Sequence, residues 1–136
     1  MALFVVDSSV AAAWCFPEEH SGYANAVLQA MLPPVEAAAP RLFAYEIHNS
    51  VLMGLRRKRI TKVDAESFLD YLWRLPIRLH DPESYGDVFQ LAERYGLTVY
   101  DAAYLDLAMR SGVPLATQDA ALSRSAGQSG IAIFQP

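Results

Sequence analysis

Short hydrophobic runs recur along this chain, and each is too short to form a buried helix. The runs at residues 3–6, 75–79, 113–117 and 131–134 are rich in apolar and β-branched residues, so they predict buried strands. Residues 35–40 form a link with room for a short strand. Their Ala-Ala-Ala-Pro end is typical of a lead-in to the next helix.

Longer stretches between these runs space their apolar residues as a helix does. Within residues 42–59, Phe43, Ile47, Val51 and Leu55 recur at every fourth position and form one stripe. Capping residues, prolines and glycines mark the ends of the other helices. The remaining predicted helices run from Val10 to a break near Pro17, over 21–31 before Pro33 and Pro34, over 61–73 with Thr61 as N-cap, over 82–95 with Pro82 in the first turn and Gly96 at the end, over 101–110 before Gly112, and over 119–125.

Strands that alternate with helices predict βαβ units, whose strands pair in parallel. With helices on both faces of the sheet, the predicted fold class is α/β, a three-layer α/β/α sandwich around a central parallel sheet. Residues 41–74 hold two helices with no strand between them, so this helical pair projects from the sheet as a hairpin. At 136 residues and without internal repeats, the chain is expected to be one domain spanning residues 1–136.

Composition narrows the class of protein. Hydrophobic residues make up 53% of the chain, which excludes a disordered protein. No apolar run approaches the roughly 20 residues of a membrane span, and the first residues lack the basic start and cleavage site of a signal peptide. The single cysteine, Cys15, allows no internal disulfide, and we expect it to be a small buried hydrophobe. These features predict a cytoplasmic protein that does not enter a membrane.

Four carboxylates occupy positions where a charge is costly: Asp7, Glu46, Asp101 and Asp119. The three aspartates follow β-like runs by one to three residues, the run before Asp101 being 97–100, and Glu46 lies beside the apolar stripe. In a parallel sheet the carboxyl ends of the strands converge on one edge. Anions gathered there raise each other's pKa unless a cation intervenes. The joint pattern predicts a divalent-metal site, although each aspartate alone could be a helix cap and Glu46 alone an exposed acid.

Four segments together resemble the motifs of the PIN-domain ribonucleases in order and spacing. They are VVDSSV at 5–10, EIHN at 46–49, YDAAYL at 100–105 and LATQD at 115–119. Each motif alone is weak, but the set is specific, and the resemblance covers nearly the whole chain. The closest resemblance is to the VapC-type toxins of bacterial toxin–antitoxin pairs.

The resemblance implies a metal-dependent RNA endonuclease whose acidic cluster is Asp7, Glu46, Asp101 and Asp119. Hard Mg²⁺ or Mn²⁺ prefers carboxylate and water oxygens. We expect Asp7 and Asp101 to be the closest metal ligands. Glu46 should bind the metal directly or orient the attacking water, and Asp119 should act through water or hold a second ion.

The resemblance also implies supporting polar roles for Ser9, Asn49 and Thr117, from their positions in the motifs. It implies RNA as the substrate, a homodimer that places two active sites in one groove, and an antitoxin protein. The antitoxin's tail would cover the acidic groove, with an Arg or Lys that reaches the carboxylates. The RNA sequence that is cleaved, the number of metal ions and the identity of the antitoxin stay open.

Charge is distributed unevenly along the chain. The net charge of −4 argues weakly against a nucleic-acid-binding protein. Yet five of the 11 basic residues fall in one seven-residue stretch. These residues form either a solvated turn or a set of contacts to RNA phosphates beside the acidic pocket: Arg56, Arg57, Lys58, Arg59 and Lys62.

Several further polar and aromatic residues are placed outside the site. Asp106 lies five residues after Asp101, roughly 140° around the helix from it, so we expect a solvated acid. The histidines His20, His48 and His80 share no ligand spacing, which favours surface or core positions. Four aromatic residues are expected in the core or on a dimer surface instead of stacking on bases: Tyr23, Phe68, Tyr71 and Trp73.

Three alternative functions fit less well. A phosphoacceptor receiver domain needs an acidic pair after its first strand and a late lysine, but serines follow Asp7 and no lysine follows Lys62. A haloacid-dehalogenase-like phosphatase needs a second aspartate where this chain has Ser9. A catalytically silent PIN scaffold that only binds a partner is disfavoured because all four acids are present.

Overall fold

The computed structural model describes residues 2–19 and 21–136, so the prediction for His20 lies outside the described residues. Within them, four parallel strands form a sheet in the order β3-β2-β1-β4. The strands are β1 (Phe4–Val6), β2 (Ala37–Pro40), β3 (Ile77–His80) and β4 (Leu115–Ala116). The helices are α1 (Ser8–Cys15), the short 3-10 helix η1 (Pro17–Glu19), α2 (Gly22–Ala30), α3 (Leu42–Arg56), α4 (Lys62–Leu72), α5 (Tyr85–Tyr95), α6 (Val99–Ser111) and α7 (Ala120–Gln128).

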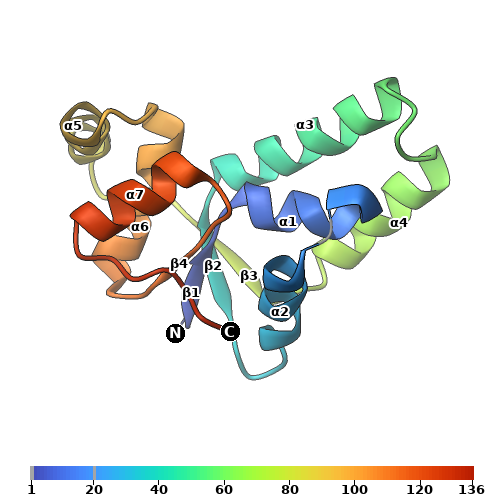
Figure 1. Cartoon of the computed structure of the whole chain (residues 1–136), viewed down its shortest axis with the longest axis horizontal. Coiled ribbons are helices and arrows are strands. Elements are labelled where there is room, and N and C mark those ends of the chain that lie inside the picture. The colour runs from blue at the N-terminus through green and yellow to red at the C-terminus, as the bar shows by residue number, and fades with distance from the viewer. Residues whose placement is uncertain (1, 20) are drawn as a thin grey trace.

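The sheet lies between two groups of helices (Figure 1). On one side are α1 and α2 with the α3–α4 pair, and on the other are α5, α6 and α7. This arrangement confirms the predicted three-layer α/β/α sandwich around a parallel sheet. The α3–α4 pair extends away from the sheet as the predicted hairpin (Figure 1). None of the helices in the described part of the chain is both long and apolar enough to cross a membrane.

The core is centred on β1, whose three residues are fully buried. A strand covered by helices on both faces presents no polar side, which is why Phe4, Val5 and Val6 form a continuous apolar run. The Phe4 ring stacks on Phe134, with the ring centroids 4.0 Å apart. This packing fixes the strand whose end leads directly into Asp7.

The α3–α4 hairpin is anchored to α1 by close packing. A side chain at Gly54 would collide with the ring of Phe16, so glycine lets the two helices approach. Arg57 ends α3, and the Thr61 hydroxyl accepts a hydrogen bond from the Asp64 N–H at 3.2 Å to cap α4, as predicted. The end of α3 is therefore packed directly against the end of α1.

The short strand for which residues 35–40 left room is present. Ala37–Pro40 is a buried strand that pairs with β1 on one side and β3 on the other, so its Ala-Ala-Ala-Pro end is not merely a helix lead-in. Alanine has little intrinsic preference for a strand, so the tertiary setting overrides local propensity here. Small side chains suit this position because helices cover both faces of the sheet.

Other predicted boundaries also need correction. Residues 131–134 contribute only a single bridge, between Ile133 and Leu115, and not a full strand. The β-like run at 97–100 is not a strand, because Thr98 caps α6 and Val99 already belongs to it. Helix α5 begins after Ser84, whose hydroxyl accepts from the Asp87 N–H, and not at Pro82.

Candidate active site

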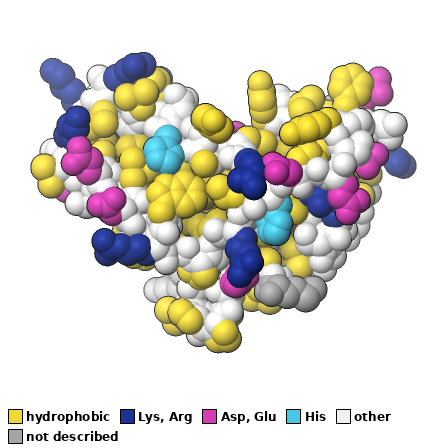
Figure 2. Space-filling model, turned by 180° about the vertical axis from the view of Figure 1, so that it is seen from behind, with side chains coloured by type: hydrophobic (Ala, Val, Ile, Leu, Met, Phe, Trp, Pro, Cys, Tyr) yellow, Lys and Arg dark blue, Asp and Glu magenta, His cyan; other side chains and the backbone are white. Residues whose placement is uncertain are grey.

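Two of the four predicted acids lie at the carboxyl ends of neighbouring strands. Val6 of β1 is paired with Ala116 of β4, and the Asp7 N–H donates to the Ala116 carbonyl at 2.9 Å. Asp119 follows three residues after this pair. Glu46 comes from the second turn of α3 and Asp101 from the first turn of α6. Figure 2 shows the molecule from behind, with a notch at the top between the hairpin side and the α5–α6 side.

Asp7 is held by hydroxyl groups and is only 4% exposed. Ser9 Oγ and Thr117 Oγ1 both donate to its Oδ2 atom, at 2.8 and 2.7 Å. Ser8 Oγ is 3.4 Å from Oδ1. The alternative of a capping side chain does not apply to Asp7, which occupies the N-cap position of α1 but makes no side-chain cap bond. Its carboxylate is instead fixed and turned toward the other acids.

Ser9 and Thr117 also join α1 to the loop that follows β4. The Thr117 hydroxyl accepts from the Asp119 N–H at 3.0 Å while it donates to Asp7. The Ser9 hydroxyl accepts from the Gln118 N–H at 3.0 Å. Both predicted supporting residues therefore contact the first acid, and Thr117 links it to the backbone of the last.

Glu46 is half-buried and accepts a short hydrogen bond, 2.5 Å, from the Tyr104 hydroxyl to Oε1. Burial raises the pKa of Glu46, and the negative charges of Asp7 and Asp101 raise it further, while the hydroxyls of Tyr104 and Ser8 oppose the rise. Sequence reasoning missed Tyr104. The available signal was its place three residues after Asp101, which puts the two on one face of α6.

Asp101 and Asp119 are fixed through the starts of helices. The Thr98 hydroxyl caps α6 by accepting from the Asp101 N–H at 3.0 Å. Burial raises the pKa of Asp101, and the charges of Asp119 and Asp7 add to the rise. Asp119 Oδ1 accepts from the Leu122 N–H at 2.8 Å, so the helix-cap role considered for Asp119 is correct. While it caps α7, the Asp119 carboxylate still raises the pKa of Asp101 through its charge.

The four carboxylates are electrostatically coupled. The charge of Asp7 raises the pKa of Glu46 and of Asp101, and the charge of Asp119 also raises the pKa of Asp101. A cluster of oxygen donors in which burial and neighbouring negative charges raise the pKa of Glu46 and of Asp101 fits a hard divalent cation. Over residues 2–19 and 21–136, however, no three acidic, histidine or cysteine side chains already close on one point as a metal cage. The chemistry of the four carboxylates nevertheless fits such an ion.

Asn49 is directed elsewhere. It is exposed on α3 and lines a hollow of about 220 Å³ with Phe16, Glu19, Arg57 and Arg59. Among the hydrogen bonds of the described residues, none joins Asn49 to one of the four acids. The predicted supporting role would therefore have to act on a substrate or partner along α3.

The basic stretch lies at the tip of the hairpin. Arg56 is ten residues after Glu46 on α3, which separates them by about 15 Å along the helix. Arg59 forms ion pairs with Glu18 at 2.6 Å and Glu19 at 3.5 Å, and its guanidinium lies 4.3 Å from the centre of the Phe16 ring.

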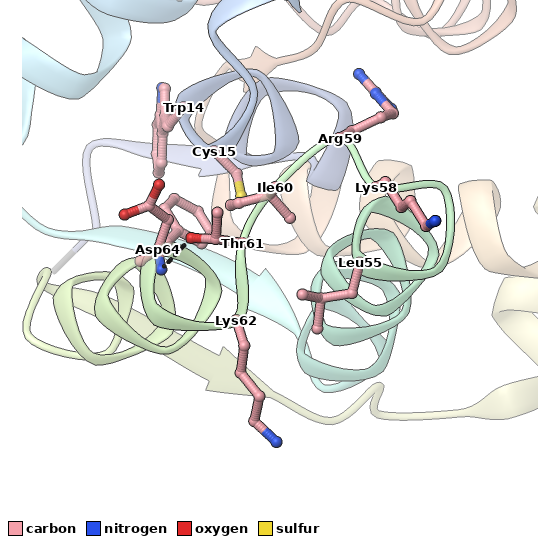
Figure 3. Close-up of a pocket in the computed structure, with 10 residues that line it drawn as sticks. Trp14, Cys15, Leu55, Lys58, Arg59, Ile60, Thr61, Lys62 and Asp64 are labelled. Atoms are coloured by element: carbon pink, nitrogen blue, oxygen red, sulfur yellow. Dashed lines mark hydrogen bonds between the residues drawn. The ribbon is translucent and has the colours of Figure 1, made fainter.

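Beside this stretch, a pocket of about 620 Å³ opens between α1 and the hairpin (Figure 3). Its walls include Trp14, Cys15 and Ile60. Figure 3 shows the charged ends of Lys58, Arg59 and Lys62 pointing outward in different directions. The basic side chains thus do not converge on one anion.

The expectation that Asp106 is solvated is wrong. It is 5% exposed and accepts from Arg110 Nε at 2.9 Å, one turn later on α6. Asp106 and Arg110 line a hollow between α5 and α6, so α5 covers the helix face that lies away from the sheet. The periodicity of α6 alone cannot reveal that α5 packs on its outer face. The spacing of four between Asp106 and Arg110 was nevertheless an available signal for an ion pair.

The remaining residues set outside the site have structural contacts. His48 Nδ1 lies 2.6 Å from the Ala44 carbonyl, and its ring stacks on Trp73. Tyr23 donates to the Phe134 carbonyl at 2.9 Å. Cys15 is buried as expected, and burial raises the pKa of its thiol to about 11. Phe68 is partly buried against the core, whereas Tyr71 and Trp73 are partly exposed. His80 is the last residue of β3.

Comparisons with known proteins agree with this geometry. The model of the PIN domain family matches residues 4–128. Ribonuclease VapC3 from Pyrobaculum aerophilum is 39% identical over 123 residues, which cover 88% of this chain and 91% of the relative. The crystal structure of PAE2754 from the same organism superposes with a TM-score of 0.74 at 24% identity, over 91% of this chain and 84% of that one, and shares its fold. Because the family model spans the sheet and all four acids, the chain belongs to the PIN-domain family.

Proposed function

We propose that this protein is a divalent-metal-dependent endoribonuclease, the toxin of a toxin–antitoxin pair, and that residues 1–136 form its single PIN domain. The observation that carries the proposal is that Asp7, Glu46, Asp101 and Asp119 lie near enough to the carboxyl edge of the sheet for their charges to act on one another. The similarity to Ribonuclease VapC3 supports RNA as the substrate. Membership of the PIN-domain family disfavours both the receiver-domain and the haloacid-dehalogenase-like alternatives.

In this proposal Asp7 and Asp101 bind Mg²⁺ or Mn²⁺, with Glu46 and Asp119 as ligands directly or through water. A bound divalent cation activates water and offsets the charge that develops on the phosphoryl oxygens. Ser9 and Thr117 orient the Asp7 carboxylate toward the ion. Glu46, whose pKa is raised by burial and by neighbouring charges, is suited to take a proton from the attacking water.

The RNA backbone would extend from the acids along α3 to the basic stretch at the hairpin tip. Arg56, Arg57, Lys58, Arg59 and Lys62 then contact phosphates some distance from the cleaved bond. Arg59 is already engaged with Glu18 and Glu19, whereas Lys62 makes only a long, exposed ion pair with Glu66 at 3.9 Å. Lys58 and Lys62 are therefore better available for this role. Such contacts position a strand without reading its sequence.

A homodimer and an antitoxin complete the proposal. Large exposed apolar side chains come from α5 and from the starts of α3 and α6, on either side of the notch (Figures 1 and 2). Tyr45 is 82%, Tyr85 76% and Tyr100 65% exposed. A second copy that covers these side chains would place two acidic sites along one groove. The antitoxin's tail would block that groove in the cytoplasm, where the RNA is. Light scattering that finds only monomer at every concentration would contradict the dimer.

The direct test is cleavage of single-stranded RNA with Mn²⁺. We expect internal cuts that EDTA abolishes. Loss of cleavage in Asp7→Asn, with cleavage retained in Asp70→Asn on the exposed face of α4, would tie the reaction to the acidic cluster. RNA binding without cleavage in any divalent metal would favour a catalytically silent scaffold.

A further inference from the structure

A fully buried tyrosine hydroxyl reaches into the acidic cluster. Tyr104 on α6 has no exposed surface, and its hydroxyl donates to Glu46 Oε1 at 2.5 Å. The bond joins two separate elements, α6 and α3, across 58 residues of sequence. It is thus a tertiary contact made directly on one of the four acids.

Tyr104 and Asp101 are delivered to the site by the same helix. They are three residues apart, so they lie on one face of α6 about 60° from each other. Asp101 presents its carboxylate from the first turn, and Tyr104 presents its hydroxyl one turn deeper. The α6 helix therefore supplies both an acid and a donor that holds the acid of α3.

The hydroxyl is not needed to fill space. A phenylalanine would occupy the same buried volume, whereas a buried hydroxyl must find a hydrogen-bond partner. The partner here is the carboxylate of Glu46. The Ser8 hydroxyl, 3.4 Å from Asp7 Oδ1, lies near enough to Glu46 and Tyr104 to lower the pKa of each. Side chains of α1, α3 and α6 therefore come together beside the acidic cluster.

We infer that Tyr104 is a positioning residue whose hydroxyl holds the Glu46 carboxylate in the orientation that binds the divalent cation. A long, flexible glutamate side chain loses rotational freedom when it binds a metal. A rigid buried donor restricts that freedom beforehand. Partners that orient metal ligands in this way commonly change metal affinity by about 10- to 100-fold. The inference rests on the proposed function, because it assumes that Glu46 acts toward a metal.

The test measures Mn²⁺ affinity by electron paramagnetic resonance, independently of cleavage. Tyr104→Phe removes only the hydroxyl, and we expect the Mn²⁺ dissociation constant to rise about 10-fold. Tyr71→Phe on α4 is the matched control, since it removes a tyrosine hydroxyl from the partly exposed hairpin surface, and it should leave the affinity unchanged.

The same substitution is then made in a Glu46→Gln background. If Tyr104 acts through Glu46, Tyr104→Phe adds no further loss of affinity there. An equal loss in both backgrounds would indicate a general packing defect and overturn the inference. So would an unchanged affinity in Tyr104→Phe alone.

The two proposals fail in distinguishable ways. If Asp7→Asn and Glu46→Gln both retain full Mn²⁺ affinity, the metal-dependent nuclease itself is wrong. If these two lose affinity while Tyr104→Phe does not, only the role of Tyr104 is wrong. Urea unfolding of each variant without metal checks that the fold is retained.

Discussion

Two aspartates on one helix, five residues apart, have opposite electrostatic surroundings. Asp101 lies near the carboxyl edge of the sheet, where burial raises its pKa and the charges of Asp119 and Asp7 raise it further. Asp106 faces α5, is more deeply buried and is paired with Arg110. Over residues 2–19 and 21–136, Arg110 neutralises the acid at the α5–α6 interface, whereas no ion pair joins a basic side chain to the four acids at the sheet edge. This contrast supports the proposal that the four acids bind a cation.

The largest expected effect is on activity at the sheet edge. Asp101→Asn should reduce Mn²⁺-dependent cleavage by at least about 100-fold, because it removes a proposed direct ligand and the loss of even an outer partner of a metal ligand costs about 10- to 100-fold. The measurement is initial cleavage rate on a labelled RNA. Asp106→Asn is the control and should retain the rate of cleavage per folded molecule. Equal cleavage rates for Asp101→Asn and the unsubstituted protein would show that Asp101 has no special role in the reaction.

The largest expected effect on stability is at the α5–α6 interface. Asp106→Asn should lower the free energy of unfolding by about 2 kcal/mol, because it removes the negative charge that pairs with the partly buried Arg110 and leaves that residue only neutral acceptors such as the Asp81 carbonyl. Urea unfolding measures this change. Replacing both residues, as Asp106→Leu with Arg110→Met, should recover much of the loss. An unchanged unfolding midpoint in Asp106→Asn would show that the ion pair does not contribute to stability.

A smaller effect is expected from the hydroxyls that hold Asp7. Thr117→Val keeps the shape of the side chain and removes the donor to Oδ2, so Mn²⁺ affinity should fall about 10-fold. Titration calorimetry provides the measurement. Ser125→Ala on α7 removes a buried hydroxyl that donates to the Ala121 carbonyl instead, and it should leave Mn²⁺ affinity unchanged.

The pH dependence of stability should reveal the raised pKa values of Asp101 and Glu46 at the sheet edge. Raised pKa values mean that folded Asp101 and Glu46 hold protons which the unfolded chain has already released. Without metal, stability should therefore fall as pH rises above the ordinary values of 3.8 and 4.5. Asp101→Asn should flatten this fall and make the metal-free protein slightly more stable at pH 7. Unfolding midpoints across pH 4–7 test the sign, and a midpoint that instead rises more steeply in the unsubstituted protein than in the variant would contradict it.

The smallest effect is expected at the hairpin tip, where charges are exposed. Replacing Lys58 and Lys62 by alanine should weaken RNA binding modestly and leave stability nearly unchanged. If both contact phosphates, the slope of log affinity against log salt should fall by about 1.4. An unchanged slope would assign the basic stretch to a solvated turn.

Much of the fold was predictable because helix caps, terminal glycines and short apolar runs are local features of the sequence. The hydroxyls of Ser21 and Thr61 begin helices by accepting a backbone N–H. Gly96 and Gly112 end helices in the left-handed region, with φ of 65° at each, which favours glycine. Apolar runs at β1 and β4 identified strands whose ends position Asp7 and Asp119. These features depend on a few neighbouring residues, so the sequence alone is enough.

The sequence by itself determined the α/β class, the hairpin and the order of the four acids, because periodicity, caps and motif spacing are local properties. Only the tertiary structure decided that Ala37–Pro40 is a central strand, that Asp106 is buried against α5, and that Ser9, Thr117 and Tyr104 hold two of the acids. Each of these outcomes depends on residues far apart in the chain. Burial and hydrogen bonding are set by which elements pack together, and a linear pattern does not contain that information.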